Sequence, residues 1–161
     1  MSTTTPEYGG KAEPKLFIPA LAPFYARVRE LSWPLIRLTA GGVLLAHGIG
    51  KLMGPGVAAF AAGSLSRRGI EPALPLAYVV FVNETIGAVA VMLGLFTRFF
   101  AAAIAIELSV ITFVAHFPNG FFFTNASGGW EYPLLFGLVF FAIALRGGGP
   151  YSLDRAIGRE L

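Results

Sequence analysis

Residues 33–53 form an apolar stretch that nevertheless carries Arg37, His47 and Lys51. An ionisable group at membrane depth is costly, so it normally faces protein or water rather than lipid. With about 100° of rotation per residue, one stripe of the predicted helix holds Arg37, Gly41, Leu44, Gly48 and Lys51. Two cations therefore share a face with two glycines, which would let a neighbouring helix approach closely. We expect the rest of the chain to supply anions for this stripe.

The composition is typical of a membrane protein. Hydrophobic residues make up 55% of the 161 residues, charged residues make up 13%, and the mean hydropathy is +0.69. A soluble domain usually has about 25% charged residues, so a soluble helical bundle is disfavoured. Cysteine is absent, which excludes iron–sulfur clusters held by cysteine and zinc sites built from thiolates. No basic–aromatic motif indicates nucleic-acid binding.

Four apolar segments in series predict an all-α fold, a four-helix transmembrane bundle, with spans at 33–53, 74–96, 99–116 and 131–145. Residues 57–66 are too short and too weakly apolar to span, so they predict a short interfacial helix between spans one and two. Three parts follow: a disordered and amphipathic segment at 1–31, a four-span membrane domain at 32–150, and a short C-terminal helix at 151–161 that Ser152 caps. The distribution of Lys and Arg predicts a multi-pass protein of the cell membrane with both termini in the cytoplasm.

Several polar side chains fall at similar depths in the predicted bundle. A rise of about 1.5 Å per residue places Asn83 and Glu84 near the midplane and His47 about 6 Å outside it. Lys51, His116, Trp130 and Glu131 lie further toward the outer surface. One cavity open to the non-cytoplasmic side could then be lined by His47, Lys51, Asn83, Glu84, His116 and Glu131. For His116 alone, an interfacial histidine at a helix end is the simpler interpretation. His47 and Glu84 can both change protonation, which general acid–base chemistry requires.

Arg37 lies toward the cytoplasmic side, and Glu107 is the nearest anion in depth. The sequence therefore predicts a structural ion pair between Arg37 and Glu107. The buried charges also allow a purely structural interpretation, in which ion pairs only fix the register of the helices. Intramembrane ionisable groups more often serve function, and that interpretation is preferred.

Cofactor and metal motifs are weak in this sequence. His47 and His116 do not specify a haem, and no close spacing of ligands predicts a metal site. Neither a GxGxxG sequence nor a P-loop is present, so nucleotide binding has no support.

The chain resembles the DoxX family of small four-helix membrane proteins from about Arg37 to Asp154. The resemblance rests on the order of several short motifs: Arg37, the stretch Ala46-His47-Gly48-Ile49-Gly50-Lys51-Leu52, Glu84 with Gly87, Leu93-Gly94-Leu95-Phe96-Thr97-Arg98, His116, Gly129-Trp130-Glu131-Tyr132, Gly147 to Gly149, and Tyr151-Ser152-Leu153-Asp154. It implies an oxidoreductase role, since relatives include a membrane subunit of thiosulfate:quinone oxidoreductase and others are linked to oxidant detoxification. It also marks Arg37, His47, Lys51, Glu84 and His116 as site candidates.

The leading hypothesis is a quinone-linked redox membrane subunit. His47, Glu84 and Lys51 would carry the chemistry, while Arg37, Asn83, His116, Trp130 and Glu131 would bind quinone or substrate. Electrons would come from a redox partner protein or from a substrate such as a sulfur oxyanion, and a homo-oligomer is compatible with the sequence. The alternatives are a non-catalytic membrane anchor or assembly factor, and a small proton-coupled transporter that uses Glu84 and Glu107.

Overall fold

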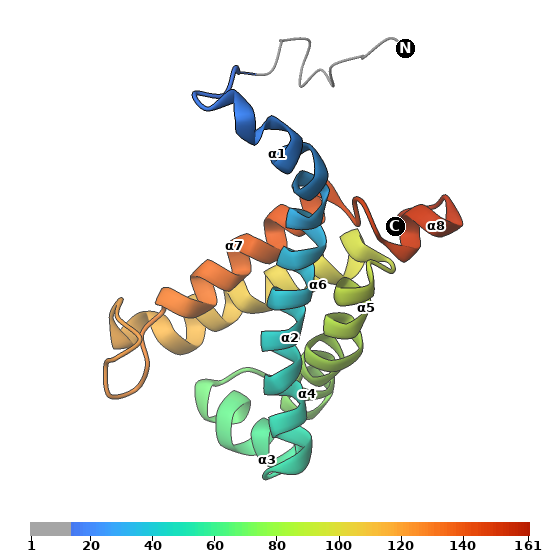
Figure 1. The fold of residues 1–161 in the computed structure, drawn as a ribbon. Coiled ribbons are helices and arrows are strands. Elements are labelled where there is room, and N and C mark those ends of the chain that lie inside the picture. The colour runs from blue at the N-terminus through green and yellow to red at the C-terminus, as the bar shows by residue number, and fades with distance from the viewer. Residues whose placement is uncertain (1–13) are drawn as a thin grey trace. The chain divides into compact units, whose positions relative to one another are not determined.

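A computed structural model describes residues 14–161, and its regular secondary structure over this range is entirely helical. The all-α fold is therefore confirmed for these residues, whereas the disorder expected at residues 1–13 lies outside them. The chain divides into two compact units, one ending at Ser32 and one running from Trp33 to Leu161. Figure 1 shows the succession of helices from α1 to α8.

The first unit contains short helical turns separated by proline. A 3-10 turn at Pro19–Leu21 leads into α1 (Ala22–Val28), and a second 3-10 turn follows at Arg29–Leu31. Proline has no amide hydrogen and is tolerated in the first turn of a helix, where Pro23 lies in α1. None of these turns buries a side chain, and Phe17, Phe24 and Tyr25 are exposed. The predicted placement of this segment on a membrane surface stays a prediction.

Helix α2 (Ser32–Met53) buries the stripe that the sequence predicts. Its buried residues are Trp33, Arg37, Ala40, Gly41, Leu44 and Gly48, and Lys51 is half-buried in its last turn. Both stripe glycines lie against the next long helix. A Cβ added to Gly41 would lie 2.8 Å from the Ala88 carbonyl oxygen, and one added to Gly48 would lie 2.7 Å from that of Glu84. The prediction of a close helix approach at these glycines is confirmed.

A short helical segment follows α2, as predicted. It comprises α3 (Val57–Phe60), a π-helical turn at Ala61–Leu65 and a 3-10 turn at Ser66–Arg68. Its buried Val57 and Ala61 pack with Ala73 and Ala77 of α4 (Ala73–Val82). The segment is thus fixed to the start of the second long helix, and its interfacial position stays a prediction.

Two further long helices each contain a π-helical turn. Helix α4 continues through a π-helical turn at Asn83–Gly87 into α5 (Ala88–Leu93), and we call this continuous stretch the second long helix. Helix α6 (Thr97–Val110) continues through a π-helical turn at Ile111–His116 and a 3-10 turn at Phe117–Asn119. Such π-helical turns are rare and often occur at functional sites. The first of them contains Asn83 and Glu84.

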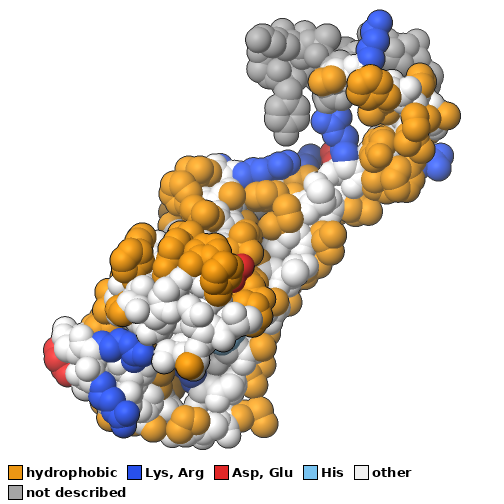
Figure 2. Space-filling view, turned by 90° about the vertical axis from the view of Figure 1, so that its left-hand side faces the viewer, with side chains coloured by type: hydrophobic (Ala, Val, Ile, Leu, Met, Phe, Trp, Pro, Cys, Tyr) orange, Lys and Arg blue, Asp and Glu red, His pale blue; other side chains and the backbone are white. Residues whose placement is uncertain are grey.

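Three helical stretches are long and apolar enough to cross a membrane: Pro19–Met53, Ala73–Leu93 and Thr97–Asn119. Helix α7 (Glu131–Arg146) has 16 residues and is shorter than these. The count of four spans therefore stays a prediction. Hydrophobic side chains cover much of the face drawn in Figure 2, and Ile106, Leu145 and Leu35 are each about two-thirds exposed.

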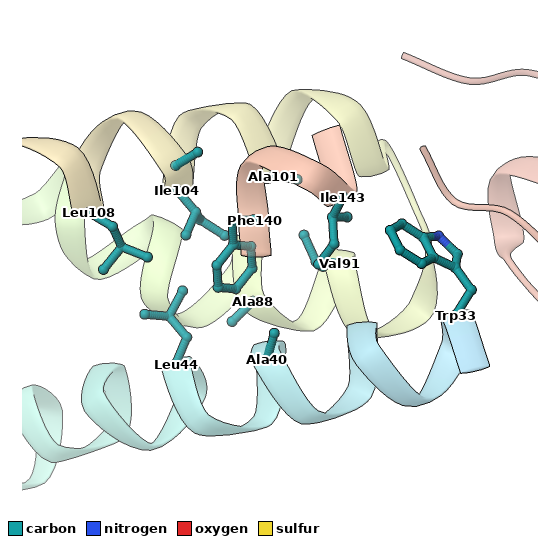
Figure 3. Close-up of a cluster of buried hydrophobic side chains, with 11 residues drawn as sticks. Trp33, Ala40, Leu44, Ala88, Val91, Ala101, Ile104, Leu108, Phe140 and Ile143 are labelled. Carbon is teal, nitrogen blue, oxygen red and sulfur yellow. The ribbon is translucent and has the colours of Figure 1, made fainter. Parts of the chain in front are cut away.

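One apolar cluster joins α2, α5, α6 and α7 (Figure 3). Ile104, Phe140 and Ile143 are fully buried in it, and Leu44 and Ala88 contribute from α2 and α5. Helices α6 and α7 pack against each other along their length. The chain ends in α8 (Leu153–Ile157), where the Ser152 hydroxyl accepts a hydrogen bond from the Arg155 amide at 3.2 Å. The predicted Ser152 cap is confirmed.

Candidate functional site

Lys51 and Glu84 form an ion pair between the last turn of α2 and the π-helical turn of the second long helix. The Glu84 side chain is only 5% exposed and the Lys51 side chain 17%. Gly48 makes the pair possible, because a larger residue one turn before Lys51 would meet the Glu84 backbone. The Lys51 ammonium also lies 4.9 Å from the centre of the Phe60 ring, a cation–π contact with α3.

Glu107 of α6 extends this site. The Asn83 side-chain amide donates a hydrogen bond to Glu107 Oε2 at 2.9 Å, and the second oxygen, Oε1, is buried without a hydrogen-bond partner among residues 14–161. Glu107 is 9% exposed, and the charges of Glu84 and Lys51 act on it. We call Lys51, Asn83, Glu84 and Glu107 the Lys51 cluster.

The charges of the Lys51 cluster do not cancel. One ammonium stands beside two carboxylates, so the cluster is negative by one charge unless a proton or a cation joins it. A buried charge without a partner is costly, and a carboxylate can remove that cost by taking up a proton. The geometry therefore suits a group that gains and loses protons inside the unit Trp33–Leu161, which we call the helical body.

Arg37 lies at the opposite end of α2 and does not contact Glu107. Its guanidinium donates to backbone carbonyls at the end of α5, Val91 at 3.3 Å and Met92 at 3.4 Å. It also donates to the carbonyls of Pro150 at 3.4 Å and Tyr151 at 3.0 Å. The predicted ion pair between Arg37 and Glu107 is wrong. Carbonyls at the end of α5 and in the segment between α7 and α8 bond the guanidinium instead, because carbonyls outside or at the end of a helix lack a partner within it and attract cations. The Arg37 Nε is buried without a hydrogen-bond partner among residues 14–161.

His47 does not enter the Lys51 cluster. Its side chain is exposed on α2, although its neighbour Gly48 is buried against the π-helical turn. No hydrogen bond or ion pair joins the His47 ring to any other described residue. The structure thus brings Lys51 to Glu84 and Asn83 to Glu107, and it leaves His47 outside the Lys51 cluster. The cavity expected around these residues stays a prediction.

The three predicted site residues near residues 116–131 stabilise a loop. His116 Nδ1 is 3.0 Å from the Gly128 carbonyl oxygen, and the Trp130 ring stacks on Phe117 with centroids 5.8 Å apart. Glu131 Oε2 accepts a hydrogen bond from the Phe123 amide at 3.3 Å. Within residues 14–161, none of the three contacts a member of the Lys51 cluster.

Asp154 is a buried polar residue whose role the sequence did not reveal. Its carboxylate accepts hydrogen bonds from the amides of Phe96 at 2.7 Å and Thr97 at 2.9 Å, and from the Thr97 hydroxyl at 2.6 Å. It thereby caps the N-terminus of α6, although it lies 57 residues further along the chain. The available signal was its place in the motif Tyr151-Ser152-Leu153-Asp154, which carries part of the family resemblance but says nothing of a partner in α6.

The family follows from comparison with known proteins. A model of the DoxX family matches residues 32–117, more than half of the chain. The chain belongs to the DoxX family. The DoxX match includes Arg37 and the whole Lys51 cluster, and it ends before Trp130 and Asp154, which the resemblance had also included. Together with the three long apolar helices, the match indicates a DoxX membrane protein.

One relative of this DoxX protein comes from Haemophilus influenzae and carries the name "Uncharacterized protein". It is 35% identical over 82 residues, which is 50% of this chain and 60% of the relative. The chain therefore spans less than two thirds of that relative. No solved structure matches this DoxX chain. Among residues 14–161, no group of three or more His, Asp and Glu side chains could hold a metal ion.

Proposed function

We propose that this DoxX protein is an integral membrane subunit of a quinone-linked oxidoreductase system and that the Lys51 cluster is its proton-handling site. The observation that carries the proposal is the buried Glu107 Oε1, which has no hydrogen-bond partner within the described residues 14–161, in a carboxylate that interacts with the charges of Glu84 and Lys51. An intramembrane carboxylate is expensive to bury, which favours a functional role over a structural one.

The residues present suit the chemistry of a quinone. Reducing a quinone to a quinol takes two electrons and two protons, and both carboxylates of the Lys51 cluster can carry protons. A protonated Glu107 could donate a hydrogen bond through Oε1, the atom left without a partner. Lys51 can stabilise negative charge on a bound oxygen. Electrons would come from a two-electron donor, either a sulfur oxyanion or a soluble or membrane redox partner protein.

The proposal also includes the membrane topology. Helix α7 would act as a fourth, short span beside the three long ones, with α3 at the interface and both termini in the cytoplasm of the cell. Its 16 residues would span about 24 Å, and a bilayer tolerates such a deficit by thinning locally. His47 would face a lipid, a partner or a second copy rather than the Lys51 cluster.

A non-catalytic anchor or assembly factor is the second candidate. The observation that favours it is the Lys51–Glu84 pair itself, since an ion pair between α2 and the second long helix is sufficient to fix the register of the two helices. In that case, neutralising Glu84 would lower the amount of folded protein more than neutralising Glu107 would, because only Glu84 is paired with Lys51.

The test is a quinone assay on gently purified protein with Glu107→Gln. Glutamine keeps the hydrogen bond from Asn83 within reach but cannot carry a proton. We expect wild-type protein to retain about one quinone per chain and Glu107→Gln to retain at least tenfold less, at equal yield and thermal stability. Glu131→Gln is the matched control, because Glu131 is the first residue of α7 and its carboxylate bonds the Phe123 amide, outside the Lys51 cluster.

Two results would contradict the redox proposal. The first is wild-type protein without bound quinone, and the second is equal retention by Glu107→Gln and Glu131→Gln. A pH-driven flux in liposomes that Glu107→Gln abolishes, without any bound quinone, would instead identify a proton-coupled transporter.

A further inference from the structure

The C-terminal segment after α7 contains a pocket rich in arginine. The pocket has a volume of about 410 Å³, and Arg146, Arg155 and Arg159 line it together with backbone of Gly149 and Pro150. All three arginines are exposed. Arg155 and Arg159 are four residues apart, and Arg146 lies over the Trp33 ring with 4.5 Å between its guanidinium carbon and the ring centre.

The acidic residues that also line this pocket already bond elsewhere. Asp154 accepts the three hydrogen bonds that cap α6, and Glu160 bonds the Gly148 amide at 2.5 Å and Arg98 Nε at 2.9 Å. No acidic side chain among residues 14–161 bonds Arg146, Arg155 or Arg159. The pocket therefore presents three guanidinium groups without an anion, and guanidinium groups favour the planar, bidentate recognition of phosphate.

The backbone around the pocket is fixed to the helical body. Arg37 bonds the Pro150 and Tyr151 carbonyls, the Asp154 amide donates to the Gly94 carbonyl at 2.8 Å, and the Phe99 amide donates to the Leu161 carbonyl at 3.0 Å. An anion that binds here would meet arginines on a preorganised backbone, so little ordering cost would oppose binding.

The same segment exposes apolar side chains. Tyr151, Leu153, Ile157 and Leu161 are 68%, 43%, 58% and 65% exposed. Leu153, Arg155 and Ile157 lie on α8, and Arg159 follows its C-cap Gly158, so the segment presents both apolar and basic groups. This combination is typical of a segment at the boundary between headgroups and acyl chains.

We propose that Arg146, Arg155 and Arg159 form a binding site for the phosphate of an anionic phospholipid headgroup, with the apolar side chains of the C-terminal segment in contact with its acyl chains. A free phosphate shares the headgroup chemistry but would gain nothing from the exposed Tyr151, Leu153 and Ile157. The site is independent of the quinone proposal, because it lies at the end of the chain that Asp154 and Glu160 attach to α6 and α7.

The test compares lipid binding by the wild type with Arg155→Gln/Arg159→Gln. The full-length protein in detergent is mixed with vesicles of phosphatidylcholine alone or with equal parts of phosphatidylcholine and phosphatidylglycerol, and the lipid bound per chain is measured. The matched control is Arg67→Gln/Arg68→Gln, which removes two exposed arginines from the turn after α3. Yield and thermal stability are compared for all three proteins.

We expect the wild type to prefer phosphatidylglycerol and the Arg155/Arg159 variant to bind it about 25-fold more weakly, at about fivefold for each basic residue. The Arg67/Arg68 control should retain at least half of the wild-type binding. Equal losses in both double variants, or no preference of the wild type for phosphatidylglycerol, would overturn the proposal. Complete displacement by inorganic phosphate at an ionic strength where chloride has no effect would make a soluble anion the ligand and overturn the lipid assignment.

Discussion

Replacing Gly48 with alanine should destabilise the protein, whereas the same change two residues later should not. Alanine is a better helix former than glycine by about 1 kcal/mol, so Gly50→Ala, with no atom within 4 Å of the added Cβ, should gain up to that amount. At Gly48 the added Cβ would lie 2.6 Å from Thr85 Cγ2 and 2.7 Å from the Glu84 carbonyl oxygen. Both separations are shorter than van der Waals contact.

The size of the effect follows from what can move. A carbonyl within a helix cannot rotate away, so α2 and the π-helical turn must separate or tilt, and overpacking of this kind costs about 1–3 kcal/mol. Subtracting the helix-propensity gain leaves a net loss of up to about 2 kcal/mol for Gly48→Ala. The two variants should thus differ by about 1–3 kcal/mol, which for a chain of this size is a difference in Tm of about 2–12 °C.

Thermal unfolding in detergent micelles, followed by far-ultraviolet circular dichroism, measures this difference. Gly41→Ala gives an intermediate case, because its Cβ would lie 2.5 Å from Met92 Cγ, an atom in a flexible side chain, and 2.8 Å from the Ala88 carbonyl oxygen. The expected order of Tm is Gly50→Ala highest, then Gly41→Ala, then Gly48→Ala. A Tm for Gly48→Ala equal to or above that of Gly50→Ala would refute the close packing of α2 against the second long helix.

Three further substitutions test other parts of the structure, and each is measured by its Tm relative to the wild type. Asp154→Asn weakens the cap on Thr97 and should cost about 1–2 kcal/mol, and an unchanged Tm would show that α6 does not depend on the cap. Trp33→Phe removes the Nε1 donor from the Gly147 carbonyl at 2.9 Å and should cost about 1–3 kcal/mol. His47→Ala changes an exposed side chain and should stay within about 0.5 kcal/mol, so a large loss would place His47 in an unseen interface.

The helical architecture could be predicted because hydrophobic periodicity is local. The stripe on α2 follows from rotation per residue alone, and Arg37, Gly41, Leu44 and Gly48 are indeed buried. The same rotation places His47 about 80° from the centre of that stripe, which explains its exposure. The four-residue spacing between His47 and Lys51 was therefore a weaker indicator of the surroundings of His47 than its angle around the helix.

The partners of the buried charges could not be predicted in the same way. The Arg37 guanidinium bonds backbone carbonyls. Because every residue has a backbone carbonyl, the sequence gives no signal for which carbonyls are available to accept from Arg37. Asp154 caps α6 across 57 residues of intervening chain, and only the folded arrangement brings them together. The π-helical turn places Asn83 and Glu84 in contact with different partners, Glu107 and Lys51, and no local pattern marks such a turn.

The two ends of the helical body hold their buried charges in different ways, and the difference bears on function. Arg37 and Asp154 bond mainly to backbone groups, which neither titrate nor leave without unfolding a helix end. In the Lys51 cluster the partners are side chains, and one oxygen of Glu107 has none. A change of protonation at the Lys51 cluster can therefore exchange one side-chain partner for another, at the place where Gly48 already brings α2 against the π-helical turn. The contacts of Arg37 and Asp154 at the other end stay fixed while the contacts of the Lys51 cluster rearrange.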